Sequence, residues 1–379
     1  MQLETFEWSA KTGWSVGSFP SLDGERTLVV VFGSSAHIDR PAPITELARF
    51  YARSHLIGCS TSGEIFQSRI SDGSLAVAVA QFAASELRTA STAVGKEVGS
   101  FAAGAALARQ LAAPTLRSVL VLSDGLSVNG SELVQGLNSV LPEHVVVTGG
   151  LAGDGDRFQR TWVIEQGVPK TGYVTAVGLC GDRLDIGHGS KGGWDIFGPE
   201  RVVTRARGNV LFELDGSPAL QLYKQYLGER ASGLPATGLL FPLAIREHAS
   251  DERHLVRTIL SVDEQAQSMT FAGDVPQGWR AQLMKANFDR LIGGASEAAQ
   301  LSKRGATRSA ARLAIAVSCV GRRLVLGERA EEEVEATLDV LDRGARQIGF
   351  YSYGEISPYT TGSCDLHNQT MTLTTISER

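Results

Sequence analysis

A histidine between two glycines is the clearest candidate for ligand chemistry in this sequence. His188 lies in the run GHGSKGGWDIFGPER, residues 187–201. Imidazole is a common iron ligand, and its glycine neighbours carry no side chains that would keep a flat ligand away. The same run and the residues just after it have two aromatic side chains that could pack on a macrocycle and three basic ones that could pair with its carboxylates: Trp194, Phe197, Lys191, Arg201 and Arg205. By itself the pattern is weak, because most glycine-flanked histidines are ordinary loop residues.

Two Gly-Glu pairs are the second candidate. Glu64 and Glu355 end the related runs GCSTSGEI and GFYSYGEI, of which four of eight positions are identical. The two carboxylates could face a shared pocket if the segments pack by pseudo-symmetry. Alternatively, each could cap backbone amides at a tight strand exit, since a duplicated fold would duplicate its structural glutamates. The sequence favours neither alternative.

Motifs for nucleophiles, phosphates and metals are weak. Cys59 and Ser60 lie in GCSTSG, which lacks the Gly-x-Ser-x-Gly spacing, and Cys59 has no local base. The glycine-rich run 149–155 has no phosphate-loop spacing, and the run 124–130 has no calcium-loop period. His367 is expected to be a hydrogen-bonded residue at a strand edge. The four cysteines form no CxxC pair, which opposes a zinc ribbon and indicates a reducing compartment.

The sequence contains three copies of one strand–helix–strand pattern, which we expect to position several of these residues. Each copy has an apolar strand, a small-residue turn, an amphipathic helix and a second strand that ends in glycine and an acid. The copies begin at Leu28, Ser118 and Leu313, with helices expected over residues 44–54, 131–140 and 331–341. Such segments are typical of βαβ units, in which ligands tend to bind at the carboxyl ends of the strands. Many of the 42 glycines lie at these strand ends.

Between the second and third copies, the sequence pattern changes from βαβ units to antiparallel strands. Residues 201–214 predict a hairpin that turns at Gly208 and Asn209, and residues 254–273 alternate like antiparallel strands. The predicted fold class is therefore mixed α/β and α+β, with repeated βαβ units in mixed sheets, helices on their faces and an antiparallel insertion.

The length of 379 residues favours two domains. We place them at residues 28–220 and 221–360, with a final strand that reaches residue 376.

Composition and charge oppose several classes of function. The formal net charge is −5 and no long basic run is present, which opposes a nucleic-acid surface. The first ten residues contain no Lys or Arg, so neither a secretory leader nor a transit peptide is expected. The longest mostly apolar stretch, residues 75–84, is half the length of a membrane span. We expect a cytoplasmic protein that binds neither nucleic acid nor membrane.

Several segments together resemble the FIST family. They are GCSTSGEI, LSDGLSVNGSELVQGL, GGLAGDG, GNVLFELDGSPALQLYKQYLG and the ending from GFYSYGEISP to CDLHNQTMTLTTI, in order from about residue 28 to residue 376. Proteins of this family are bacterial and archaeal signal-transduction sensors with an N-terminal and a C-terminal FIST part. The resemblance implies a ligand-binding sensor, not an enzyme, that passes its signal to a separate partner.

Within the family, HGSKGGWDIFGPERVVT resembles the nitric-oxide-sensing branch called NosP. Members of that branch are described as haem-binding proteins that regulate histidine kinases and cyclic-di-GMP signalling. The resemblance implies that His188 is the iron ligand, that Lys191, Trp194, Phe197 and Arg201 surround the haem, and that a sensor histidine kinase is the partner. A small organic ligand such as an amino acid, without haem, is the alternative. An enzyme that uses Cys59 is a third hypothesis, and a homodimer is compatible with all three.

Overall fold

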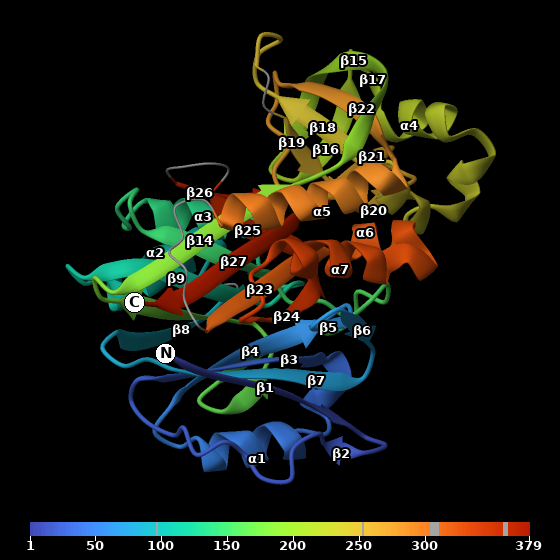
Figure 1. Cartoon of the computed structure of the whole chain (residues 1–379). Helices are drawn as coiled ribbons and strands as arrows, with labels where there is room; N and C mark the ends of the chain where they lie inside the picture. Colours follow the sequence, from blue (N-terminus) through green and yellow to red (C-terminus); the bar gives the residue numbers. More distant parts are fainter. Residues whose placement is uncertain (96–97, 252–253, 304–310, 359–362) are drawn as a thin grey trace.

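The strands of the protein form four β-sheets (Figure 1). The structure describes residues 1–95, 98–251, 254–303, 311–358 and 363–379. The structure is a computed structural model. Three of the sheets each contain one predicted βαβ unit, and the fourth lies at one end of the molecule. The predicted mixed α/β class with an antiparallel insertion is confirmed.

The first βαβ unit organises the N-terminal sheet. Its parallel strands β3 and β4 are joined through helix α1 (Ala42–Phe50), whose Ile44 and Leu47 pack on Val29 and Val31. Pro43 lies in the first turn of the helix, where its missing amide leaves no helical hydrogen bond unmade. The order of the seven strands is β12 (Val168–Lys170), β11 (Val163–Glu165), β4 (His55–Thr61), β3 (Thr27–Ser34), β7 (Ser74–Gln81), β1 (Gln2–Ser9) and β2 (Gly13–Trp14).

The second unit organises the middle sheet. Helices α2 (Ser100–Leu111) and α3 (Gly130–Asn138) pack on its outer face, and Asn129 caps α3 by accepting the amides of Ser131 and Glu132. Asparagine is one of the residues preferred at this position of a helix. The order of the six strands is β26 (Cys364–His367), β25 (Gly354–Pro358), β10 (Val146–Leu151), β9 (Leu116–Ser123), β13 (Tyr173–Cys180) and β8 (Glu86–Ala93).

The third unit organises the C-terminal sheet. Its outer face is covered by α5 (Phe288–Ser302) and α7 (Ala330–Val340), and the short α6 (Val320–Leu326) follows its first strand. Three glutamates in the first turn of α7 complement the helix dipole. The order of the six strands is β14 (Leu184–Lys191), β27 (Met371–Glu378), β23 (Arg312–Cys319), β24 (Ala345–Ser352), β5 (Glu64–Phe66) and β6 (Arg69–Ser71).

After each βαβ unit the chain crosses to a neighbouring sheet. Strand β5 leaves β4 and pairs with β24, β25 leaves β24 and pairs with β10, and β11 leaves β10 and pairs with β4. Each of the three sheets therefore contains a strand from another βαβ unit, and the cycle closes on itself. At each crossing a glycine precedes a buried acid: Gly63 and Glu64, Gly153 and Asp154, Gly354 and Glu355.

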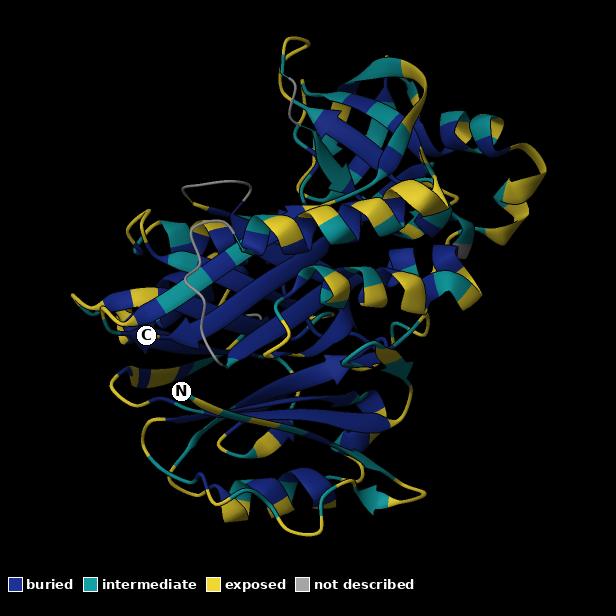
Figure 2. Cartoon of the chain, in the orientation of Figure 1, coloured by how far each residue is buried: buried dark blue, intermediate teal, exposed yellow. Residues whose placement is uncertain are grey.

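The three sheets enclose one central apolar core. Phe32, Leu122, Val317 and Phe350 belong to it, and the inner strands are almost entirely buried (Figure 2). Burial of this core is the main favourable contribution to the folding of the three-sheet body. In the described ranges, no helix is long and apolar enough to span a bilayer.

The fourth sheet is the antiparallel insertion, and it has its own core around Tyr223 of α4 (Ala219–Leu227). The predicted turn at Gly208 and Asn209 joins β15 to β16. Along the main path the order is β19 (Leu255–Arg257), β18 (Leu243–Arg246), β22 (Arg280–Ala286), β15 (Trp194–Arg207), β16 (Val210–Leu214), β21 (Ser268–Phe271) and β20 (Ile259–Asp263), and β17 (Ser217–Pro218) pairs with β16.

Candidate ligand-binding site

The ends of the three βαβ units converge on one cavity. Ser34 ends β3, Thr61 ends β4, residues 155–157 follow β10, and Val320 follows β23. The cavity that they line has a volume of about 610 Å³. It lies where the sequence predicts ligands to bind, at the carboxyl ends of the parallel strands.

Two more cavities continue from this one toward the insertion sheet. The first, of about 550 Å³, shares Asp156 and Leu324 with it, and the second, of about 260 Å³, shares Phe158 and Leu260 with the first. We call these three cavities, which meet around residues 156–158, the junction cleft. The cleft thus lies between the three-sheet body and the insertion.

One end of the junction cleft carries charge. Arg323 donates to both carboxylate oxygens of Asp72, at 2.8 and 2.7 Å, and to the Ser62 carbonyl at 2.6 Å. The hydrogen bond from Arg323 lowers the pKa of Asp72. Arg157 donates to the buried Asp154 at 2.6 Å, while about half of the Arg157 side chain is exposed. The half-exposed guanidinium group of Arg157 can therefore meet an anion that enters the cleft, while Arg323 is held by Asp72.

Glu64 lines the same end but already has hydrogen-bond partners. Its carboxylate accepts from the Thr61 hydroxyl and from the amide and hydroxyl of Ser74, at 2.9 Å each for Ser74. Burial raises the pKa of Glu64 to about 7, although the hydrogen bonds from Thr61 and Ser74 act to lower it. Its side chain supports the crossing from β4 to β5 and the start of β7.

Glu355 has the same arrangement in the third unit. It accepts from the Ser352 hydroxyl at 2.6 Å and from the amide and hydroxyl of Thr370 at 3.1 and 2.9 Å, and burial raises its pKa to about 8. The contacts of both glutamates match the capping alternative. Glu64 alone of the two also lines the junction cleft.

The other end of the cleft is apolar. Phe158 stacks on Tyr353 with ring centroids 4.4 Å apart, and the wall continues through Leu234, Leu240 and Leu324. Leu324 is 42% exposed. A ligand with an apolar part could cover it.

His188 lies in a strand and not in an open loop. Its neighbours Gly187 and Gly189 face helix α5, where a Cβ atom would lie 1.8 Å from the Ser302 carbonyl oxygen and 2.1 Å from that of Ala298. The two glycines therefore allow a helix to approach the strand closely, which corrects the expectation that they open a path for a flat ligand. The half-buried imidazole alternates to the opposite face, on the side of Ile186 and the central core.

The Nδ1 atom of His188 is buried and has no hydrogen-bond partner in the described part of the chain. Burial lowers the pKa of this histidine. The imidazole is therefore neutral near pH 7, which is the form that binds metal ions. Among the described residues, no three His, Cys, Asp or Glu side chains are grouped as metal ligands.

The other residues predicted around His188 have separate partners. Lys191 pairs with Glu297 at 3.6 Å, and Trp194 is buried and donates to the Gln369 carbonyl at 3.0 Å. The remaining residues lie on β15 in the insertion sheet, where Phe197 contacts Lys285, Arg201 bonds Asp215 and Tyr226, and Arg205 pairs with Glu213. The predicted set is thus divided between two sheets, and it does not fit a haem as one group.

Cys59 lies in the central core with no exposed surface. Burial raises the pKa of its thiol well above the usual range. A nucleophilic cysteine needs an accessible thiolate, so this position does not suit one. His367, expected at a strand edge, is buried at the end of β26 and its Nε2 bonds the Ser357 carbonyl oxygen at 2.9 Å.

Comparison with known protein families identifies two domains in the chain. Residues 27–217 match the FIST N domain and residues 219–358 match the FIST C domain. The chain belongs to the FIST family. FIST domains are ligand-binding sensor domains of signal transduction. No curated protein sequence matches the chain.

The FIST N match includes β14 and all of β15, and the two matched regions share sheets. Strand β14 pairs with β27, which lies after the FIST C match, and β5 of the FIST N region pairs with β24 of the FIST C region. The junction cleft is accordingly lined by residues of both regions.

Sequence reasoning missed the residues that give the cleft its chemistry. Arg157 and Phe158 lie two and three residues beyond Gly155, which ends the glycine-rich run of the second copy. Arg323 and Leu324 lie two and three residues beyond Gly321, in the turn of the third copy. Applying the strand-end rule to all three copies, and collecting the residues that follow each, would have brought these four together.

Proposed function

We propose that this FIST protein senses a small organic ligand that has both a charged and an apolar part, such as an amino acid, and binds it in the junction cleft. The observation that supports this proposal is the composition of the cleft. Two arginines and several carboxylates line one end, and leucines and Phe158 line the other. Pockets of a few hundred cubic ångströms with an apolar wall and a few directed polar groups are typical of small-ligand sites.

Each end of the cleft suits one part of such a ligand. The half-exposed guanidinium group of Arg157 can bind a carboxylate through charge-assisted hydrogen bonds, and Arg323 adds positive charge beside it. The exposed carboxylate of Asp156 can accept from an ammonium group. The apolar side chain of the ligand would then cover Leu234 and Leu324.

A ligand in the junction cleft would contact both the three-sheet body and the insertion sheet. Binding would therefore favour one relative packing of the two parts over another. We propose that a cytoplasmic partner, such as a histidine kinase in a cyclic-di-GMP pathway, reads this packing.

Arg157→Ala tests the site. We expect at least one of the twenty amino acids to stabilise the full chain in a thermal-shift screen, by about 2.7 kcal/mol at 100 times its dissociation constant. In isothermal titration calorimetry, Arg157→Ala should weaken that ligand by about 10- to 100-fold, because a charge-assisted hydrogen bond is lost.

Arg160→Ala is the matched control for this variant. Arg160 is exposed to a similar degree, but it pairs with Asp39 and does not line the junction cleft. If no amino acid binds, or if both variants weaken binding equally, the proposed ligand class or site is wrong.

Haem-based sensing of nitric oxide is the second candidate, and the unpartnered Nδ1 atom of His188 is the observation that favours it. A bound haem would supply an iron atom that takes up the gas. Reconstitution with haem should give a sharp absorption band that moves when nitric oxide is added and is lost in His188→Ala. The exposed His144→Ala is the control. An identical spectrum in His188→Ala would remove His188 from this role.

A further inference from the structure

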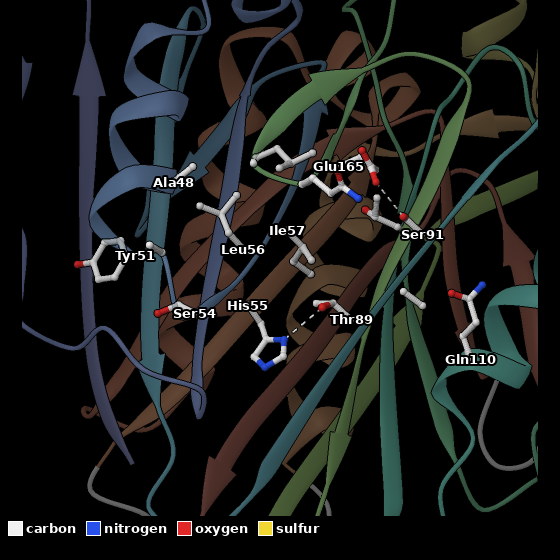
Figure 3. A pocket seen from close by; sticks show the side chains of 16 residues that line it. Ala48, Tyr51, Ser54, His55, Leu56, Ile57, Thr89, Ser91, Gln110 and Glu165 are labelled. Carbon is white, nitrogen blue, oxygen red and sulfur yellow. Dashed lines mark hydrogen bonds between the residues drawn. The ribbon is translucent and has the colours of Figure 1, made fainter.

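A second groove lies between the N-terminal and middle sheets, at the other end of β4 from the junction cleft (Figure 3). Its volume is about 460 Å³, and none of its lining residues belongs to the junction cleft. His55, which begins β4, and Thr61, which ends it, are separated by roughly 20 Å at the usual rise of a strand. Six of its polar lining residues come from β4, β8, α2, β11 and β13: His55, Thr89, Ser91, Gln110, Glu165 and Thr175.

Thr175 is the residue that points to a ligand. Its side chain is 3% exposed, and its hydroxyl has no hydrogen-bond partner among the described residues. Buried hydroxyls in folded proteins are nearly always paired, because an unpaired one loses its hydrogen bonds to water without compensation. Thr175 lines the groove, so a molecule in the groove is the nearest candidate for that partner.

Glu165 is a buried carboxylate whose charge is already balanced. It is 7% exposed, accepts a hydrogen bond from Ser91 at 3.3 Å and pairs with Lys170 outside the groove lining. Because Lys170 balances the charge of Glu165, the groove does not need a cationic ligand. The carboxylate oxygens of Glu165 can instead accept hydrogen bonds from hydroxyl groups.

His55 completes a neutral polar wall. Its Nδ1 atom lies 3.2 Å from the Thr89 hydroxyl, and burial lowers its pKa, so the ring is uncharged near pH 7 (Figure 3). The groove lining also includes apolar side chains, namely Ala48, Leu56, Ile57 and Ile164.

We propose that this groove binds a small neutral molecule with several hydroxyl groups, such as a sugar or a polyol. Hydroxyls both donate and accept, which matches a lining of hydroxyls, an amide, a neutral imidazole and a charge-balanced carboxylate. The apolar side chains of the lining suit the C–H face of a sugar ring. The site is separate from the junction cleft, so either can be correct without the other.

Isothermal titration calorimetry of the full chain with D-glucose, D-ribose and myo-inositol tests the proposal. We expect at least one of these probes to bind with one site per chain. Thr175→Val keeps the shape of the side chain and removes the hydroxyl, so it should weaken that probe by about tenfold. The melting temperature of the free protein should be unchanged or higher, because the variant no longer buries an unpaired hydroxyl.

Thr148→Val is the matched control. Thr148 is a fully buried threonine of β10 with an unpartnered hydroxyl, but it does not line the groove. This variant should leave binding of the probe unchanged. Absence of binding by all three probes at millimolar concentration would overturn the proposal, as would equal binding by the wild type and Thr175→Val. Arg157→Ala should have no effect on the probe, which separates this test from that of the junction cleft.

Discussion

Replacing Arg322 by alanine should lower the free energy of unfolding by about 3 to 5 kcal/mol, because it leaves a buried carboxylate without its cation. Arg322 and Glu333 are both fully buried and lie 2.8 Å apart. The guanidinium also donates to the carbonyls of Gly192 at 2.8 Å and Leu291 at 2.7 Å. It thereby joins α6 and α7 to the start of α5 and to the turn between β14 and β15. Chemical denaturation followed by circular dichroism measures the change.

Two further variants separate the charge from the packing. Arg117→Ala removes an exposed arginine that pairs with the exposed Asp182, and should change stability by less than about 0.5 kcal/mol. The double variant Arg322→Met with Glu333→Leu should recover part of the loss, because it leaves no buried charge unpaired, although the carbonyls of Gly192 and Leu291 still lose their donor. If Arg322→Ala costs no more than the exposed control, the buried network does not stabilise the fold.

Replacing Gly349 by alanine should destabilise the protein by about 3 kcal/mol or more, through a backbone clash. A Cβ atom at this position would lie 1.9 Å from the Ala316 carbonyl oxygen of the adjacent parallel strand. Because the obstacle is main chain, no change of side-chain rotamer relieves it. The same contact recurs in the other two units, where Gly58 faces Val31 and Gly149 faces Val121.

Gly17→Ala is the control for this change. Gly17 is exposed, its φ lies outside the left-handed region, and a methyl group added to it would meet no atom within 4 Å. Alanine at this position should therefore alter stability by less than about 0.5 kcal/mol. Thermal unfolding of the two variants beside the wild type measures both effects. Equal melting temperatures would show that the strands can separate to admit the methyl group.

The sequence predicted the elements of the fold better than their connections. The three βαβ units, the helices at 44–54, 131–140 and 331–341 and the hairpin at Gly208 all exist, with helix ends shifted by a few residues. Those signals are local, since apolar runs, helical periodicity and turn residues act over a few positions. The exchange of strands between sheets was not predicted, because pairing partners far apart in the chain leave no such pattern.

For the candidate sites too, the sequence predicted the local features and the tertiary structure decided how they come together. The sequence by itself determined that ligand-binding residues should follow the strand ends and that His188 lies between two residues without side chains. Only the tertiary structure decided that helix α5 occupies the space beside Gly187 and Gly189, and that Arg157, Phe158, Arg323 and Leu324 line one cleft. The physical reason is that a cavity is formed by side chains brought together from distant segments. Its shape and charge depend on how the sheets pack, and local sequence carries no record of that packing.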